Sequence, residues 1–565
     1  MSDLHSERSV PLTVWAEAAL RVEGTRSRLE KAAHVGDLLT TLEGDDLQRA
    51  ARWFAGHAFE ISDGRTVNVG HAAILRALEP ATGLSKDELR AKLVALGDPG
   101  TLAHETLPPR DSRLTFADLD LLFGMLAATR KRAEQHALLA AFLDDATPLE
   151  ARYAVRLLAR DLRIGMKEAG VEDALARAFD VELDEVRRAN MLVGSLGETA
   201  LRAQAGTLGE AAMRLFHPVA FMLAGAADTA DELEKLIPDG LAIEDKFDGI
   251  RCHAHIGEPN GAPLGRPVGS RHVAVFSRQR SDVTRSFPEV VDALAAALPE
   301  GDWILDGEIV ALSPDGNVAP FAALQQRLGR VRVPKDLLAE IPTVLIAYDV
   351  LYAGELVIER PLAKRRALLV DALAGTDWHV RLSDQEVWQE STEERLDARF
   401  SEARERGNEG LMAKSLASPY TPGKRGGDWL KVKRALATLD VVVTSVERGS
   451  GKRSKLYSDY TFAVRASESD DTLLSIGKAY SGLTDVELTE LSAWFVEHTT
   501  QQFAHGRVRL VEPHIVLEVA FDAVQVSKRH KSGYALRFPR IVRWRKDKHP
   551  EEIDVLGEVA RLAGG

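Results

Sequence analysis

The chain has 565 residues, 45% hydrophobic and 28% charged, which is long and apolar enough for three or four globular domains. Its single cysteine, Cys252, excludes an internal disulfide framework and any zinc site built from several thiolates. No apolar run reaches the length of a membrane-spanning helix and the amino terminus is polar, so we expect a cytoplasmic protein with no membrane partner.

The formal net charge of -13 argues at first against a nucleic-acid partner, because phosphate binding depends on Lys and Arg. The distribution of charge reverses this conclusion. Between Ser527 and His549 the chain carries nine Lys and Arg residues against one acid, Asp547. This local basic patch predicts contact with phosphates.

Residues 1–215 are rich in Ala, Leu, Arg and Glu at helical spacing, which predicts an all-helical domain. Within it Arg152, Arg156, Arg160 and Arg163 follow spacings of four, four and three, so we expect one helix with a basic stripe beside an apolar one. Gly165 is expected to end that helix. A solvated arginine face explains this spacing as well as a phosphate-binding face does.

The pattern changes after residue 215. Residues 216–434 contain short β-type runs, such as 303–310 and 343–351, separated by Gly, Pro and Asn loops, which predicts a mixed α/β domain. Residues 435–565 contain further β-type runs and a final helical segment, which predicts a small β-barrel followed by a short helix.

The strongest local motif is E-D-K-F-D-G-I-R at 244–251, which places Lys246 in a strand-and-turn context. A lysine amine is nucleophilic only when it is neutral, so it needs burial, neighbouring cations or a metal to lower its pKa. Attack on the α-phosphate of a nucleotide would leave a phosphoramide-linked Lys-AMP. Taken alone, K-x-D-G is equally typical of a surface turn.

Further motifs follow in a fixed order: S-R (277–278), L-D-G-E (305–308), Y-D (348–349), E-G-L-M-A-K (409–414), W-L-K-V-K (429–433) and R-K-D-K (545–548). Together with K-F-D-G-I-R at 246–251, the series resembles the ATP-dependent DNA ligases of the three-domain type, in the covalent nucleotidyltransferase superfamily. The resemblance covers nearly the whole chain. It implies a helical DNA-binding domain at 1–215, an adenylation domain at 216–434 and an OB-fold domain at 435–565.

The resemblance also implies residue roles. Lys246 would be the nucleophile that takes AMP from ATP, and Glu244 would accept a hydrogen bond from the adenine amino group. Tyr348 matches the position that stacks on adenine, where the family more often has Phe. The remaining nucleotide-binding residues implied are Arg251, Arg278, Glu308, Arg425, Lys431 and Lys433.

Glu308 and Glu409 would hold Mg²⁺, with Mn²⁺ as a substitute, since these ions prefer oxygen ligands and substrate phosphates. Asp248 lies in the K-F-D-G-I-R motif and Lys414 in the E-G-L-M-A-K motif, so both are further candidates for the site. Arg545, Asp547 and Lys548 match the family motif that orients the pyrophosphate leaving group, so we expect the barrel to close over ATP and then rotate.

The resemblance implies that the chain binds nicked duplex DNA. It also implies that the chain acts as a monomer. The segment L-A-R-D-L-R-I-G-M-K (158–167) is similar to the DNA-clasping part of the family, which assigns phosphate contacts to Arg163 and Lys167. Phe321 and Phe538 match positions that press on the minor groove beside the nick. An ordinary role in the hydrophobic core explains both phenylalanines equally well.

Three other functions remain to be weighed. An RNA ligase or a capping-type nucleotidyltransferase would share the lysine motif, but neither is expected to carry a helical domain of about 215 residues. A non-catalytic DNA-binding scaffold would not need the acids Glu308 and Glu409. An NAD-dependent ligase would need a four-cysteine zinc module.

His253 and His255 alternate on one strand without a third ligand in view, so we expect no metal site there.

Overall fold

The computed structural model describes all residues except 1–8, 68, 259–263, 331, 376–377, 390, 433–436, 450–452, 454–455, 504–505 and 564–565. It divides into two compact units. The first comprises Met1–Gly225, Asp239–Gln389 and Lys414–Trp429, and the second Ala226–Pro238, Glu390–Ala413 and Leu430–Gly565. These units do not coincide with the expected boundaries at 215 and 434, which stay a prediction.

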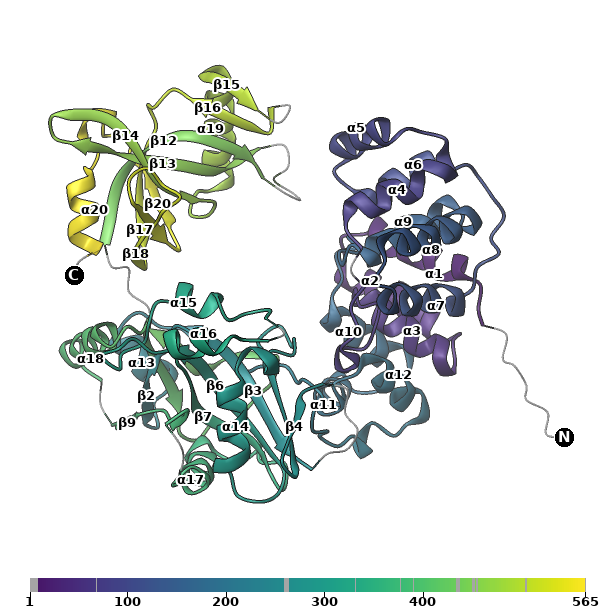
Figure 1. The fold of residues 1–565 in the computed structure, drawn as a ribbon, viewed down its shortest axis with the longest axis horizontal. Helices are drawn as coiled ribbons and strands as arrows, with labels where there is room; N and C mark the ends of the chain where they lie inside the picture. The colour runs from purple at the N-terminus through teal and green to yellow at the C-terminus, as the bar shows by residue number, and fades with distance from the viewer. Residues whose placement is uncertain are drawn as a thin grey trace. The chain divides into compact units, whose positions relative to one another are not determined.

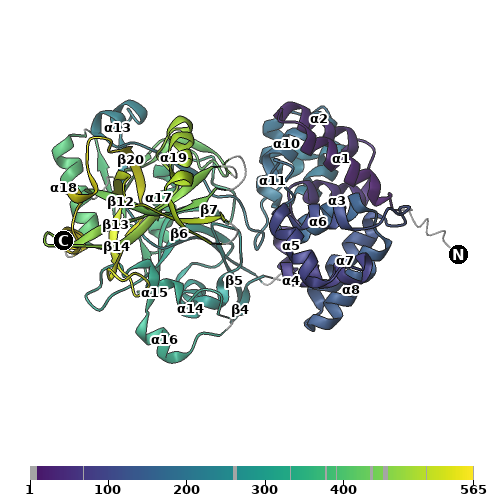
Figure 2. The same ribbon diagram turned by 90° about the horizontal axis from the view of Figure 1, so that it is seen from above.

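The amino-terminal region is helical, as expected, and its helices pack on one another (Figures 1 and 2). Its core is built mainly from Leu, Ala and Val side chains and also contains large aromatic residues, among which Trp15 contacts both Trp53 and Tyr153. Capping boxes begin α5, α7 and α9. The helices are α1 Leu12–Gly24, α2 Arg28–Leu39, α3 Gly44–Phe54, α4 His71–Thr82, α5 Lys86–Leu96, α6 Pro99–Thr106, α7 Phe116–Ala128, α8 Arg132–Asp145, α9 Pro148–Leu158, α10 Glu168–Ala178, α11 Leu183–Val193 and α12 Leu196–Ala205.

The expected basic stripe is wrong in two respects. Helix α9 ends at Leu158, because Arg160 adopts a left-handed backbone with φ 59°. Arg156 is also buried: it pairs with Glu23 at 2.8 Å and with Asp98 at 2.8 Å. Both acids come from distant segments, so the spacing of the arginines gave no sign of them.

The central region combines two sheets with several helices, which confirms the mixed α/β expectation. Their strands are β1 Leu223–Ala226, β2 Leu241–Lys246, β3 Ile250–Gly257, β4 Arg266–Val268, β5 Arg271–Ser277, β6 Trp303–Ala311, β7 Thr343–Ala353, β8 Val380–Leu382, β9 Gln385–Trp388, β10 Gly410–Ser415 and β11 Arg425–Val432. The helices are α13 Ala230–Leu236, α14 Pro288–Ala297, α15 Phe321–Gln325, α16 Lys335–Glu340, α17 Leu362–Ala372 and α18 Glu393–Glu405.

One sheet has six strands in the order β4-β5-β3-β6-β7-β8. Its central strands β3, β6 and β7 read as nearly continuous buried runs, because α14 covers the sheet through Val290, Val291 and Leu294. The other sheet has five strands in the order β1-β11-β10-β2-β9. Strand β2 pairs antiparallel with β9, and Glu244 stands directly opposite Gln385.

The carboxyl-terminal region is strand-rich, with a curled sheet in which β17 pairs with both β12 and β20. Its hydrophobic core includes Phe462, Phe495 and Leu517. The elements are β12 Ala437–Arg448, β13 Tyr457–Ser467, β14 Asp470–Ala479, α19 Asp485–Glu497, β15 Thr499–Phe503, β16 Val508–Val511, β17 Val516–Phe521, β18 Ala523–Val526, β19 Tyr534–Arg537, β20 Arg540–Trp544 and α20 Leu556–Ala563.

The order of a helical region, a mixed α/β region and a strand-rich region confirms the fold class expected from the sequence (Figure 1). Within the described residues, every helix is too short or too polar to cross a membrane.

Candidate active site

The turn after β2 carries the candidate nucleophile. Lys246 is the last residue of β2 and is half-buried, and the chain turns at 247–249 into β3. A Cβ on Gly249 would stand 2.3 Å from the Ile309 carbonyl oxygen and 2.8 Å from Cγ of Glu308. Only glycine permits this approach, so the turn presses directly against β6 beside Glu308. Asp248, in the same turn, is buried.

A buried ion pair lies two residues before the lysine. Glu244 on β2 is 1% exposed, and Nζ of Lys414 donates to its Oε2 at 2.8 Å. The Nε2 of Gln385 donates to the other oxygen, Oε1, at 2.7 Å. Burial lowers the pKa of Lys414, and the Glu244 charge opposes part of this effect. The carboxylate is therefore held at both of its oxygens.

A second buried pair lies on β3 and β6. The Nε and Nη2 of Arg251 donate to Asp306 at 3.1 and 2.7 Å, and Nη1 donates to the Met222 carbonyl at 2.7 Å. The Tyr420 hydroxyl also donates to Asp306, at 2.7 Å. Burial raises the pKa of Asp306, but the Arg251 charge and a bond to His253 outweigh burial and hold that pKa well below its usual range.

Both cations lie beside the same two rings. The Lys414 Nζ is 4.2 Å from the ring centroid of Tyr348 and 4.4 Å from that of Trp429. The Arg251 guanidinium carbon is 5.9 and 5.3 Å from the same two centroids. Tyr348 itself is buried, with 7% of its surface exposed. The structure thus gathers Glu244, Lys414, Arg251 and Tyr348, which the motifs singled out separately.

The remaining nucleotide-binding candidates lie at strand ends. Arg278 is exposed in the turn after β5, Arg425 is exposed at the start of β11, and Lys431 is half-buried near the end of β11. Lys433 lies outside the described residues. For these residues and for Arg251, a role in nucleotide binding stays a prediction.

The two glutamates expected to hold a metal fall in different compact units. Glu308 is half-buried on β6 in the first unit, whereas Glu409 belongs to the second, where Arg537 lies 3.5 Å from its Oε1. The part of the chain that the structure describes contains no group of three or more His, Cys, Asp or Glu residues arranged to hold a metal. His253 stacks on Phe221, and the His255 ring accepts the Phe216 amide.

The R-K-D-K motif of the barrel is held together by one acid, Asp440 on β12. Arg545 donates to both Asp440 oxygens at 3.0 and 2.9 Å, and the Lys548 Nζ donates to Oδ2 at 2.6 Å. Asp547 accepts from Arg545 at 2.9 Å, which lowers the pKa of Asp547. The three motif residues therefore present one connected charged group.

The candidate DNA contacts differ in exposure. Arg163 is exposed with φ 57°, and Lys167 is exposed directly before α10. Phe538 is 57% exposed, also in a left-handed conformation with φ 50°. Phe321 is half-buried against the core of the six-stranded sheet. Exposure favours a contact role for Phe538, and burial favours a core role for Phe321.

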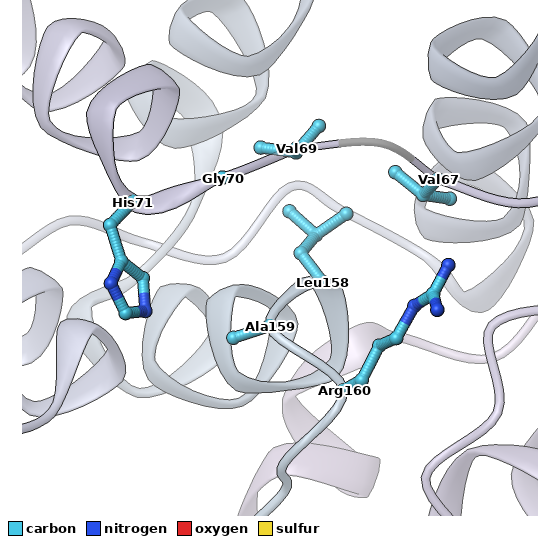
Figure 3. A pocket seen from close by; sticks show the side chains of 7 residues that line it. All are labelled: Val67, Val69, Gly70, His71, Leu158, Ala159 and Arg160. Carbon is cyan, nitrogen blue, oxygen red and sulfur yellow. The ribbon is translucent and has the colours of Figure 1, made fainter. Parts of the chain in front are cut away.

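A hollow of about 520 Å³ lies in the helical region, between the segment before α4 and the end of α9 (Figure 3). Its lining is apolar except for His71 and Arg160. Figure 3 shows the Arg160 side chain extending toward Val67, with Leu158 facing the same space. Arg160, which lines the hollow, has a left-handed backbone with φ 59°.

Three residues of the site were not expected from sequence: Asp306, Tyr420 and Gln385. Asp306 is two residues before Glu308 on one strand, so alternation alone places both acids on the same face and was available as a signal. Tyr420 follows β10 outside any motif, and Gln385 begins β9, so neither carried a local signal.

Comparison with known proteins covers all three regions. Residues 221–433 match the family model for the ATP dependent DNA ligase domain, residues 11–176 match that for the DNA ligase N terminus, and residues 453–548 match that for the ATP dependent DNA ligase C terminal region. A probable DNA ligase of Koribacter versatilis (strain Ellin345) is 43% identical over 96% of this chain and 94% of its own length.

More distant relatives agree. A DNA ligase of Methanothrix thermoacetophila is 34% identical over 98% of each chain. The solved structure titled "Pmar-Lig_PreS3" superposes with a TM-score of 0.60 at 20% identity, covering 94% of this chain and 99% of that one, and it supports the fold alone. Both the ordered motifs and these matches favour a DNA ligase over the RNA ligase, capping enzyme or scaffold alternatives. The chain belongs to the ATP-dependent DNA ligase family.

Proposed function

We propose that Lys246 is the residue through which this ligase carries AMP from ATP to nicked DNA. The observation that carries the proposal is the close packing of the Lys246 turn on β6 beside Glu308, enforced at Gly249. In the first step the neutral Nζ attacks the α-phosphorus, and the bond to the bridging oxygen of pyrophosphate breaks. AMP then passes to the 5′-phosphate of the nick, and the 3′-hydroxyl attacks that phosphate and expels AMP.

The base is proposed to be read by Glu244, whose buried carboxylate has acceptor positions left after its bonds to Lys414 and Gln385. Tyr348 supplies an aromatic face for stacking on adenine. Arg278, Arg425, Lys431 and Lys433 are proposed to neutralise the phosphates, and Arg545, Asp547 and Lys548 to act on the pyrophosphate.

Magnesium suits a carboxylate at this site, because the Cγ of Glu308 lies beside the nucleophile's turn and the nucleotide phosphates would supply further oxygens. Glu308 would hold the ion and Glu409 is proposed to assist. When bound, Mg²⁺ would neutralise charge on the transferring phosphate. One copy of the chain carries every motif of the three steps, which supports action as a monomer on nicked duplex DNA.

The test is to incubate the protein with α-labelled ATP and Mg²⁺, map the labelled peptide, and then add nicked duplex DNA. We expect label on Lys246, transfer to the DNA 5′ end, and no label in Lys246→Ala. Lys364→Ala, an exposed lysine on α17, is the matched control and should label normally. Label retained at another lysine in Lys246→Ala would refute the assignment.

A further inference from the structure

Residue Gln385 lies outside every motif yet touches the base-reading glutamate. It begins β9, at the edge of the five-stranded sheet, and stands opposite Glu244 in the β2–β9 register. Its Nε2 donates to Glu244 Oε1 at 2.7 Å, while Lys414 occupies Oε2 at 2.8 Å. The two donors therefore hold different oxygens of one carboxylate.

Two hydrogen-bond donors fix the orientation of the Glu244 carboxylate, which one donor would not do. The terminal torsion of a glutamate is broad, so a single bond from Lys414 would leave the carboxylate plane free to rotate. Lys414 cannot follow such rotation easily, because its ammonium is packed over the Tyr348 and Trp429 rings. The bond from Gln385 to the second oxygen fixes the plane, and with it the direction of the remaining acceptor positions.

We propose that Gln385 is a positioning residue that orients Glu244 toward the 6-amino group of adenine and so contributes to the choice of ATP as substrate. The inference rests on the proposed role of Glu244. A neutral amide suits this position, because it donates to the carboxylate without adding charge to a pair that Lys414 already neutralises. Gln385 is only half-buried, so its replacement leaves the core of the fold intact.

The test compares two nucleotides that differ only at the 6-position. Gln385→Met keeps the side-chain length and removes the donor. Formation of Lys-AMP is followed in single turnovers at increasing ATP, and in parallel with purine riboside 5′-triphosphate, which lacks the 6-amino group. We expect KM for ATP to rise about tenfold with a nearly unchanged maximal rate, because the contact is remote from the reacting atoms. For the analogue, the variant and the natural protein should agree within about twofold.

Gln389→Met is the matched control, since Gln389 is exposed just beyond the other end of β9. It should behave as the natural protein with both nucleotides. An equal loss with both nucleotides in Gln385→Met would show a general structural role and overturn the proposal, as would no loss with ATP. If the natural protein itself formed no Lys-AMP, the proposed function would fail instead, and the two failures are thus distinguishable.

Discussion

Replacement of Asp306 by Asn is expected to destabilise the six-stranded sheet strongly. The Asp306 carboxylate is fully buried and receives two bonds from Arg251 and one from the Tyr420 hydroxyl. An asparagine of the same shape leaves the Arg251 guanidinium buried without a counter-charge, which costs about 3 to 5 kcal/mol. The matched control is Asp292→Asn: that carboxylate also pairs with an arginine, Arg266, but its side chain is 60% exposed, so the loss should stay below about 1 kcal/mol.

Hydrogen exchange followed by mass spectrometry is the suitable assay, because it reports the local opening free energy of β3 and β6 separately from the rest of this multidomain chain. In Asp306→Asn the protection of β3 and β6 amides should fall by about 150-fold to 5000-fold, and in Asp292→Asn by less than about fivefold. A fall below tenfold in Asp306→Asn, or an equal fall in the control, would refute the reasoning from burial.

Four further outcomes are expected. Gly249→Ala should slow Lys-AMP formation at least about 100-fold, because the new Cβ meets a backbone oxygen at 2.3 Å, whereas Gly375→Ala, with nothing within 4 Å, should label normally. Phe538→Ala should reduce sealing of nicked DNA about tenfold while Lys-AMP formation stays unchanged, as single-turnover assays of each step can show. Arg163→Ala should lower the slope of log DNA affinity against log salt by about 1, measured by titration at several salt concentrations. Finally, the pKa of Asp306 is depressed in the fold, so the stabilisation that its charge provides is complete above the ordinary Asp pKa of about 3.9 and is lost as pH falls through the folded pKa. The free energy of unfolding, measured with urea below pH 4, should therefore fall more steeply with decreasing pH in the natural protein than in Asp306→Asn.

The parts of the site that the sequence predicted are those with local causes. The strand that ends at Lys246 and the glycine directly before β3 both lie in the eight-residue motif at 244–251, because the turn and the close approach at Gly249 need particular residue types. The bond between Gln385 and Glu244 joins residues 141 positions apart through strand register, which no local pattern encodes.

The same contrast explains the error in the helical region. The arginine spacing was real, but whether Arg156 faces solvent depends on Glu23 in α1 and on Asp98, which directly precedes α6. Periodicity describes one helix, whereas burial of a charge depends on what the rest of the chain brings to it.

Two buried ion pairs beside one pair of rings call for an explanation other than stability. Replacing a buried pair with apolar side chains of similar volume is often neutral or stabilising, so the pairs Glu244–Lys414 and Asp306–Arg251 are poorly explained as contributions to folding. Both pairs flank Tyr348. Charges already fixed in this way need no reorganisation when a polar base displaces water, and each pair is neutral overall, so neither repels the approaching polyphosphate. Their position thus favours a preorganised surface for a purine, and makes the orientation of Glu244 more consequential than its charge.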